Sequence, residues 1–504
     1  MKKFISVLLA STLLFSVAVV GNATAEESTE DTVITTDFTV PTESADNTVS
    51  TISTESTEST ESTESTVSTQ PTEPTQNTEP TQPKDTSPKK IKFSEDNEIL
   101  MKGEKYSCKV EYKPDDAKGK GVKYTSSDTK VATVNKKGIV KAKNKGICYI
   151  SATSSTNSKI KSTNKLKIIV TDYKFTKSFL TRNNCYKDGM AIDPKGIVVH
   201  STGCNNPNAY SYIRNWNYPT PGGREVCVHG FVGKNPKGAV QFYQALPFEM
   251  ACWGVGSGSK GSYNYYPGYI QFECCEDTTY NPSYFYTVYD EATDLCAYLC
   301  LKYNLPVEKV VSHREACLQG YGSAHGDIDH WLYRYSLTMS DFRKTVKSKI
   351  YKIDPKPDLT SGKKHKKVTV KRDTCIRKDR VVDDYGTSSK VLATISKNSV
   401  VKFIRDRRGG WSYVKTEKGK DGYIFNEDLN LEYKSKFFTG IAPSTLKIYS
   451  VPTEKSKYYV RNVPKGAKVQ FISQIKKGSK KGWAYIKYKD KYGYVHNTIP
   501  YNDN

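Results

Sequence analysis

Histidine is scarce in this sequence, no Cys-x-x-Cys pair occurs, and no long apolar run follows the first twenty residues. Without a later run of ~20 apolar residues, no further segment is expected to span a membrane. The lack of Cys-x-x-Cys pairs argues against a zinc site built from thiolates. Only seven histidines occur in 504 residues, and five of them lie within 131 residues: His200, His229, His313, His325 and His330. We therefore expect a polar functional site in that stretch.

The chain is too long for a single domain, because one hydrophobic core seldom grows beyond ~250 to 300 residues. Its twelve cysteines are spread too thinly for a disulfide scaffold. Cys108 and Cys148 stand alone in one segment and are candidates for a bridge, whereas an odd number, nine, lies from Cys185 to Cys317. We interpret the cysteines as disulfides or buried apolar residues and not as metal ligands.

The N-terminal end has the pattern of a secretory signal peptide. Two lysines precede an apolar run over residues 5–20, and an Ala-x-Ala cleavage signal ends at Ala25, before two glutamates. A membrane anchor is the alternative, but it needs ~20 apolar residues and fits less well. We expect residues 1–25 to be removed and the mature protein to be secreted.

Residues 26–90 consist largely of serine, threonine, glutamate and proline, and they lack the apolar surface that would offset the entropy of ordering. We expect a disordered, extended spacer. Residues 26–85 hold 14 acidic residues and one lysine, so residues 86–504 hold 73 basic and 39 acidic residues, a net charge of about +34. Such a charge attracts polyanions. Nucleic acid is one candidate, but an exported protein first meets wall phosphates and carboxylates. We therefore predict anionic cell-wall polymers as partners and no nucleic acid.

Residues 91–172 alternate polar and apolar side chains over short runs such as Tyr106–Tyr112 and Cys148–Thr153, with Lys-Gly turns between them. Short strands at regular spacing predict an all-β sandwich. The stretch Val122–Gly146 contains Ser-Ser-Asp-x-x-Val-Ala-x-Val followed by Gly-x-Val-x-Ala, and it resembles the bacterial Ig-like domain of group 2. That family implies a spacer or a binding domain, and we favour the spacer over adhesion.

The C-terminal part repeats one pattern. Gly-Trp-x-Tyr-x-Lys followed by Gly-Tyr begins at Gly410 and recurs from Gly482. Repetition at this spacing predicts two small β-barrels, over residues 366–433 and 434–504, after a linker at 351–365. The signature resembles bacterial SH3 domains, a family that implies attachment to peptidoglycan. The tryptophan of each copy is also expected to fill a core.

Residues 173–350 mix strand and helix patterns. Pro282 and the apolar face of Tyr284–Tyr303 predict one helix, and Ser340–Ile350 predicts another. Apolar runs predict four strands, at Gly196–His200, Val226–Val232, Ala239–Leu246 and Tyr269–Cys274. We expect an α/β domain with a central mixed sheet. The whole chain is then multidomain, with this α/β domain, an all-β Ig-like sandwich and two SH3-like β-barrels.

Two of the histidines follow apolar runs. His200 ends the first predicted strand, and His313 closes a later run; Asp327 follows 14 residues after it, with His325 two positions before the aspartate. A hydrolytic zinc site needs three protein ligands, an open position for water, a base and a positive group near the oxyanion. A lone histidine at a strand end is more often structural. The second cluster of ligand types strengthens the case for His200 as a ligand.

Three motifs resemble the zinc-dependent N-acetylmuramoyl-L-alanine amidases of the type 2 family, which share a fold with peptidoglycan recognition proteins. They are Ile-Val-Val-His-Ser-Thr ending at Thr202, Val-Ser-His-Arg-Glu ending at Glu315, and His-Gly-Asp-Ile-Asp-His-Trp ending at Trp331. The resemblance covers about residues 178–350. It implies a Zn2+ ion held by His200, His313 and Asp327. Asp329 and His330 are alternatives to Asp327 as the third ligand.

The family also places an acidic base on a central strand, and Glu273 occupies that place. Glu276 and Asp277 lie nearer the end of the strand and are less favoured. A carboxylate in an apolar strand is unusual, because burying it without a partner costs several kcal/mol. Such residues are usually functional or paired.

Two further histidines have expected roles in this segment. His325 takes the place where family members carry a Lys or His that stabilises the oxyanion. His229, in a predicted strand, is expected to line the pocket or to support a ligand. One departure concerns Trp253, which is followed here by Gly254 and Val255 where many family members have His. Substrate contacts at that position are expected to differ.

These observations predict a secreted, cell-wall-associated peptidoglycan hydrolase. It would cleave the amide bond between N-acetylmuramic acid and L-alanine, with a zinc-activated water as nucleophile. We expect a monomer that binds peptidoglycan and has no membrane span. Two alternatives stay open. One is peptidoglycan binding without catalysis, although inactive relatives typically lose a ligand and this chain keeps a full set. The other is an adhesin formed by the Ig-like segment and the basic C-terminal part.

Overall fold

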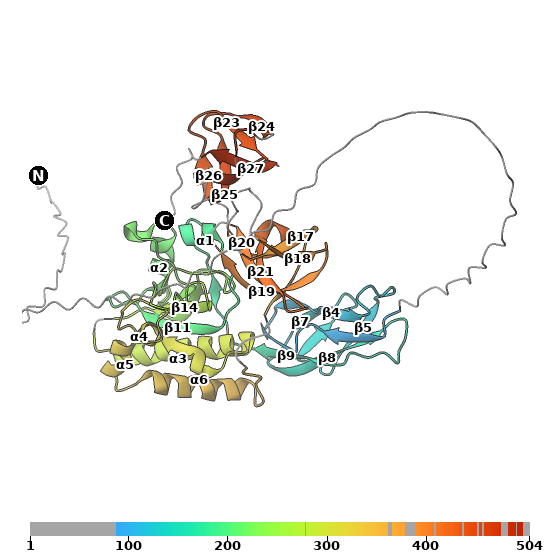
Figure 1. Cartoon of the computed structure of the whole chain (residues 1–504). Coiled ribbons are helices and arrows are strands. Elements are labelled where there is room, and N and C mark those ends of the chain that lie inside the picture. Colours follow the sequence, from blue (N-terminus) through green and yellow to red (C-terminus); the bar gives the residue numbers. More distant parts are fainter. Residues whose placement is uncertain are drawn as a thin grey trace, which may run out of the picture. The chain divides into compact units, whose positions relative to one another are not determined.

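The structure is a computed structural model of the whole chain (Figure 1). It describes residues 87–277, 279–360, 365–378, 390–407, 410–435, 438–450, 453–455, 458–474, 482–489 and 491–496. The predicted signal peptide and nearly all of the predicted spacer lie outside these residues. Among the described helices, none has the length and apolar character needed to cross a membrane.

A six-stranded mixed sheet forms the centre of the α/β segment. Its strand order is β10-β13-β12-β14-β11-β15. The bounds are Thr176–Lys177 for β10, Gly196–Ser201 for β11, Gly230–Lys234 for β12, Val240–Gln244 for β13, Tyr269–Cys274 for β14 and Val310–Ser312 for β15. The strands β14, β11 and β15 run parallel, whereas β12 and β13 pair antiparallel. Parallel strands end at one edge of a sheet, so residues at the ends of β11, β14 and β15 gather there.

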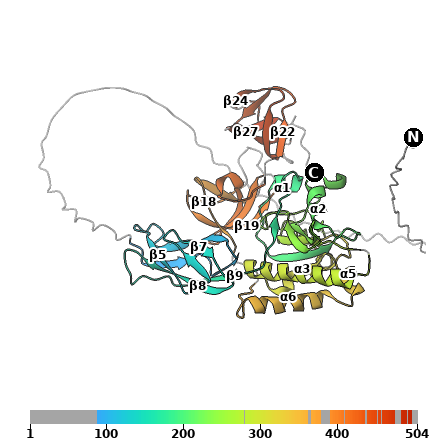
Figure 2. The same cartoon turned by 180° about the vertical axis from the view of Figure 1, so that it is seen from behind.

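Two long helices, α3 (Pro282–Tyr303) and α6 (Met339–Ile353), lie side by side and cover one face of this sheet (Figures 1 and 2). The helix α3 begins after Asn281, whose side chain accepts a hydrogen bond from the backbone N–H of Tyr284. The core between sheet and helices includes Ile197, Val199, Ile270, Phe272, Leu295, Leu299, Phe342 and Val346. Side chains alternate along a strand, so the neighbouring residues of β11 and β14 project from the opposite face.

Four shorter helices complete the segment, and the sequence patterns do not predict them. They are α1 (Asn184–Asp188), α2 (Ala209–Trp216), α4 (His313–Leu318) and α5 (Asp329–Arg334), with 3-10 turns at Pro221–Gly223 and Val307–Lys309.

The strand predicted over Val226–Val232 is only partly right. Before Gly230 the chain makes a single bridge between Cys227 and Trp253 in place of a ladder, so His229 lies just outside β12. The other three predicted strands and both predicted helices are present, with ends shifted by a few residues.

The Ig-like segment consists of short antiparallel and parallel strands in three sheets. Their orders are β2-β9-β8-β5, β3-β7-β6 and β1-β4. The bounds are Lys90–Phe93, Asn97–Met101, Lys105–Ser107, Val110–Lys113, Val122–Ser126, Ala132–Val134, Ile139–Ala142, Gly146–Ser154 and Leu166–Thr171 for β1 to β9. Cys108 and Cys148 are separate buried thiols in its core, so the bridge considered for them is absent. All twelve cysteines are free and nine are buried, as expected of small apolar residues.

Two six-stranded sheets form the C-terminal part, and their strand orders are the same. The first is β16-β19-β20-β21-β17-β18 and the second is β22-β25-β26-β27-β23-β24. This agrees with the repeat predicted from the sequence, and Trp411 and Trp483 are both buried. The bounds are Lys367–Thr369, Thr374–Arg377, Val391–Ile395, Val400–Arg407, Trp411–Thr416 and Asp421–Phe425 for β16 to β21, with a 3-10 turn at Asn426–Asp428, and Phe438–Ile441, Leu446–Tyr449, Tyr458–Val463, Lys468–Gln474, Trp483–Tyr488 and Lys491–His496 for β22 to β27.

Candidate active site

The pairing of β11 with β15 brings two histidines together. Val199 pairs with Ser312, so His200 and His313, the next residue in each segment, lie next to each other. His313 is also the first residue of α4, which begins with a capping box. Ser312 accepts a hydrogen bond from the backbone N–H of Glu315, and the Glu315 side chain accepts one from the backbone N–H of Ser312. The centroids of the two imidazole rings are 4.8 Å apart.

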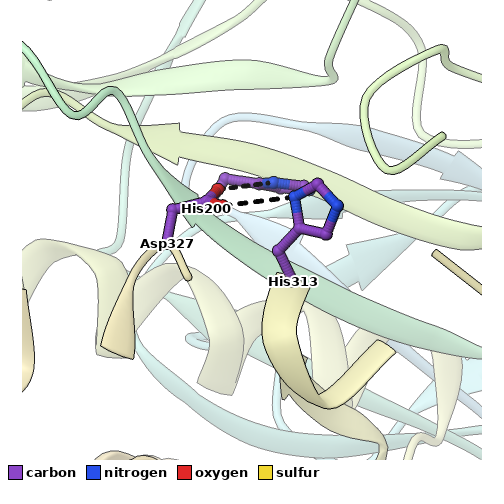
Figure 3. Close-up of side chains that lie close together, drawn as sticks. All are labelled: His200, His313 and Asp327. Carbon is purple, nitrogen blue, oxygen red and sulfur yellow. Dashed lines mark hydrogen bonds and ion pairs between the residues drawn. The ribbon is translucent and has the colours of Figure 1, made fainter. Parts of the chain in front are cut away.

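Asp327 supplies a third group at the same place. It lies just before α5, and its carboxylate faces both rings (Figure 3). Its Oδ2 is 3.1 Å from Nδ1 of His200, and its Oδ1 is 3.3 Å from Nδ1 of His313. All three side chains are buried. The structure thus brings together the three residues that the sequence predicts as metal ligands.

These three side chains fit a divalent metal ion. One possible ligand atom from each lies within 4.8 Å of the others. Nδ1 of His313 and Oδ1 of Asp327 are buried and 3.3 Å apart, but neither makes a hydrogen bond of proper geometry among the described residues. Unpaired buried polar atoms are rare and costly, and a cation between them would satisfy both. Two imidazoles and one carboxylate form a donor set that suits zinc and leaves a fourth position open.

The charge of Asp327 is set by its two neighbours. Burial by itself would raise the pKa of the carboxyl, but the imidazoles of His200 and His313 beside it outweigh burial and hold the pKa well below its ordinary value. Asp327 is therefore a carboxylate at any physiological pH, as a cation ligand must be.

Glu273 lies opposite His200 in the ladder between β11 and β14. Its side chain keeps a small exposed fraction, but its Oε2 is buried and accepts no hydrogen bond from the described residues. Burial raises the pKa of Glu273 well above its ordinary value, and the charges of Asp327 and Glu276 raise it further. A carboxyl whose pKa is raised in this way, beside a possible metal site, is a candidate to accept and release a proton.

His325 stands at the exposed rim of this cluster. Its side chain is 66% exposed, and its Nδ1 is 3.3 Å from Oδ1 of Asp327. Its ring stacks on that of His313 with centroids 4.9 Å apart. An imidazole in this position can reach a group bound beside the three buried residues. That position is compatible with the oxyanion role predicted from the sequence.

His229 lies outside the cluster and has a supporting position. It is fully buried just before β12, and burial lowers its pKa to about 4. Its Nδ1 accepts a hydrogen bond from the backbone N–H of Gln271, and its Nε2 donates one to the carbonyl of Met250. The neutral ring therefore holds β14 against the following loop. Both contacts are to backbone groups and not to a ligand side chain, so pocket lining and support of a ligand stay predictions for His229.

The alternatives for the third ligand and for the base make other contacts. Nε2 of His330 is hydrogen-bonded to Oε2 of Glu276 at 3.1 Å, and this hydrogen bond raises the pKa of His330. Asp329 is part of α5, and Asp277 accepts a hydrogen bond from a nearby threonine hydroxyl. None of these four residues belongs to the group of possible ligands in the described part of the chain.

The sequence analysis missed three polar residues around the histidines. Gln271 Oε1 is 3.2 Å from Nε2 of His200, and Ser323 Oγ is 3.3 Å from Nε2 of His313. Gln271 and Glu273 are two residues apart on β14, so their side chains lie on the same face of the strand. That period of two is a signal in the sequence that could have identified Gln271. The other two lie in loops, where no periodicity marks them: Asn264 and Ser323.

The fold and the cluster together define an α/β domain with a histidine- and aspartate-based site at the carboxyl ends of its parallel strands. Comparison with protein families is more specific. Residues 190–327 match the model of N-acetylmuramoyl-L-alanine amidases, residues 87–164 that of bacterial Ig-like domains (group 2), and residues 386–430 that of bacterial SH3 domains. The chain therefore contains a domain of each of these families, as its motifs predict. The amidase match includes Glu273 and ends on Asp327.

Solved structures with a similar arrangement cover about a third of this chain. PlyL is 23% identical over 34% of this chain and 97% of its own, with a TM-score of 0.27. The PlyG catalytic domain is 24% identical over 37% and 99%, with a TM-score of 0.28. The hydrolase AmiA of Staphylococcus aureus is 19% identical over 37% and 88%, with a TM-score of 0.28. A search of curated proteins found no match.

Proposed function

We propose that the protein is a secreted, zinc-dependent N-acetylmuramoyl-L-alanine amidase. It hydrolyses the amide bond between N-acetylmuramic acid and the L-alanine of the peptidoglycan stem peptide. One observation carries the proposal. The buried group of His200, His313 and Asp327, with Glu273 beside it, lies within the segment that matches the amidase family.

In this proposal His200, His313 and Asp327 hold a zinc ion. When bound, zinc supplies a Lewis acid and lowers the pKa of a water ligand toward ~7. Glu273 accepts the proton of the attacking water and then delivers it to the leaving amine of L-alanine. His325 donates a hydrogen bond to the carbonyl oxygen on which negative charge develops. The products are a lactyl carboxylate on the glycan and a free amino terminus on the peptide.

The remaining segments are proposed to keep the enzyme on the cell wall. The second C-terminal sheet has the strand order of the first, so we assign both to SH3-like domains that bind peptidoglycan. The excess of basic residues outside the N-terminal segment adds an attraction to anionic wall polymers that salt weakens. Residues 1–25 direct secretion, and the Ig-like domain separates the spacer from the catalytic domain.

Digestion of purified peptidoglycan by the full chain tests the proposal. We expect new L-alanine amino termini, no new reducing sugars, and loss of turnover but not of wall binding when a chelator removes the metal. Release of reducing sugars without amino groups would refute the bond assignment. Turnover that survives complete removal of bound metal would refute the role of zinc.

A further inference from the structure

The two ligand histidines each have a second ring nitrogen, and its hydrogen bond decides which nitrogen holds the proton. A ring nitrogen binds a metal only through a lone pair, so the tautomer decides which atom can be the ligand. Backbone groups have a fixed polarity, because N–H only donates and C=O only accepts. A series of hydrogen bonds that starts at the backbone therefore determines the direction of every bond that follows.

One such series ends at His200 and starts in the loop before β14. The backbone N–H groups of Gly254 and Val255 both donate to Oδ1 of Asn264, each at 3.2 Å. The same oxygen accepts from Nε2 of Gln271 at 2.9 Å, so Oε1 of Gln271 must face the other way. That oxygen lies 3.2 Å from Nε2 of His200 and can only accept. Nε2 of His200 therefore carries the proton, and Nδ1 keeps its lone pair.

A second series ends at His313 and starts at the carbonyl of Val255. The Ser323 hydroxyl donates to this carbonyl at 3.2 Å, and the Ser323 backbone N–H donates to it at 2.9 Å. With its proton committed, Oγ of Ser323 accepts from Nε2 of His313 at 3.3 Å. His313 also keeps the lone pair on Nδ1. The N–H and the C=O of one residue, Val255, thus contribute to both tautomers.

Both lone pairs then face the carboxylate of Asp327, at the distances of 3.1 and 3.3 Å given above. A divalent cation between the two nitrogens and the carboxylate could bind to all three. The arrangement is therefore that of three possible ligands around one cation.

The absence of a side chain at Gly254 belongs to the same network. A Cβ at this position would lie 2.6 Å from Oε1 of Gln271 and 2.9 Å from Cγ1 of Val228. The glutamine thus occupies the space that a side chain at position 254 would need. This explains in physical terms why glycine follows Trp253 in this chain.

We propose that Gln271, Asn264 and Ser323 are positioning residues that hold His200 and His313 in the tautomer protonated on Nε2. Both rings then present Nδ1 to a divalent cation shared with Asp327. Zinc as the cation rests on the proposed function. The tautomers themselves are properties of this chain and can be measured without metal or substrate.

The test uses the full chain labelled with 15N-histidine. Long-range 1H–15N spectra show which ring nitrogen is protonated, and the chain has only seven histidines to resolve. The variants His200→Gln and His313→Gln assign the two signals. In the metal-free protein, at a pH where each ring carries a single proton, both rings are expected to be protonated on Nε2. In the zinc-loaded protein, Nδ1 is expected to be the coordinating atom.

Two substitutions separate the two series and serve as controls for each other. Gln271→Met keeps the size of the side chain and removes the acceptor, so His200 should become a mixture of tautomers while His313 is unchanged. Ser323→Ala should have the opposite effect. In titrations with zinc alone, each variant should bind about 10- to 100-fold more weakly, as is typical when a partner of a ligand is lost.

Protonation on Nδ1 in the unsubstituted protein, or zinc bound through Nε2, would overturn the inference. So would unchanged tautomers and zinc affinity in both variants. These results are distinct from failure of the proposed function. A protein with the expected tautomers that releases no amino groups would refute the amidase assignment and leave the inference standing.

Discussion

Replacing Glu273 with glutamine should separate catalysis from stability. The substitution keeps the shape of the side chain and removes its charge. Glu273 lies opposite His200, its Oε2 is buried without a partner among the described residues, and burial raises its pKa. A raised carboxyl pKa means that the folded protein disfavours the charged form. The neutral amide should therefore leave the melting temperature unchanged or raise it.

The substitution Glu273→Gln is expected to lower the rate of the reaction without lowering the stability of the fold. A positioned general acid–base typically contributes about 10²- to 10⁴-fold to the rate. At about 1.4 kcal/mol for each factor of ten, this is about 3 to 5.5 kcal/mol of transition-state stabilisation. We expect kcat of Glu273→Gln to fall by that factor, while the zinc content stays at the level of the unsubstituted protein.

Amino-group release from purified peptidoglycan, zinc content and thermal unfolding should be measured on the same samples. Glu291→Gln is a matched control, because Glu291 is another carboxyl whose pKa burial raises, but it lies in α3, where it accepts hydrogen bonds from Tyr173 and Phe242. This control should keep full activity. A zinc-loaded Glu273→Gln with kcat within threefold of the unsubstituted protein would refute the reasoning, and loss of zinc would show that Glu273 is a ligand.

Three further outcomes are expected. Burial raises the pKa of Glu291 from 4.5 to about 7, so its contribution to stability is present below pH 4.5 and is lost as the pH rises to about 7. Denaturant unfolding should show that the free energy of unfolding falls by about 3 kcal/mol over this pH range in the unsubstituted protein and does not fall in Glu291→Gln. An equal pH dependence of the two proteins would contradict this prediction. Glu276→Gln removes a charge that raises the pKa of Glu273, so the acid limb of the kcat/KM profile should move to lower pH; a limb that stays or moves up would be inconsistent with this. Deletion of residues 366–504 should weaken wall binding at moderate salt, and equal retention of the shortened chain would rule out the C-terminal anchor.

The carboxyl edge of the sheet could be predicted because its residues end apolar runs. His200 and His313 each follow such a run, and parallel pairing of the two runs places them next to each other. Asp327 had no comparable signal, since it lies in a loop, and Asp329 and His330 follow closely as equal candidates by residue type. Family resemblance favoured it, and the three-dimensional grouping agrees.

The parts that the sequence did not predict depend on contacts between distant segments. The helices α1, α4 and α5 have five or six residues each, too few for a periodic pattern to be distinguished. Asn264 and Ser323 reach the site only because two loops pack together. Cys108 and Cys148 illustrate the converse, because a count of cysteines cannot tell whether two thiols in one core have the separation that a bridge requires.

His200 and Asp327 meet across 127 positions of the chain. An unfolded polypeptide therefore offers no preformed cage for an ion, and loading must accompany or follow folding. If the chain is exported unfolded, it would leave the cell without metal and acquire zinc from its surroundings. At a free concentration a thousandfold above the dissociation constant, this late binding would add about 4 kcal/mol to the stability of the folded enzyme. Under the proposed function, scarcity of zinc outside the cell would then weaken both the stability and the activity of the protein.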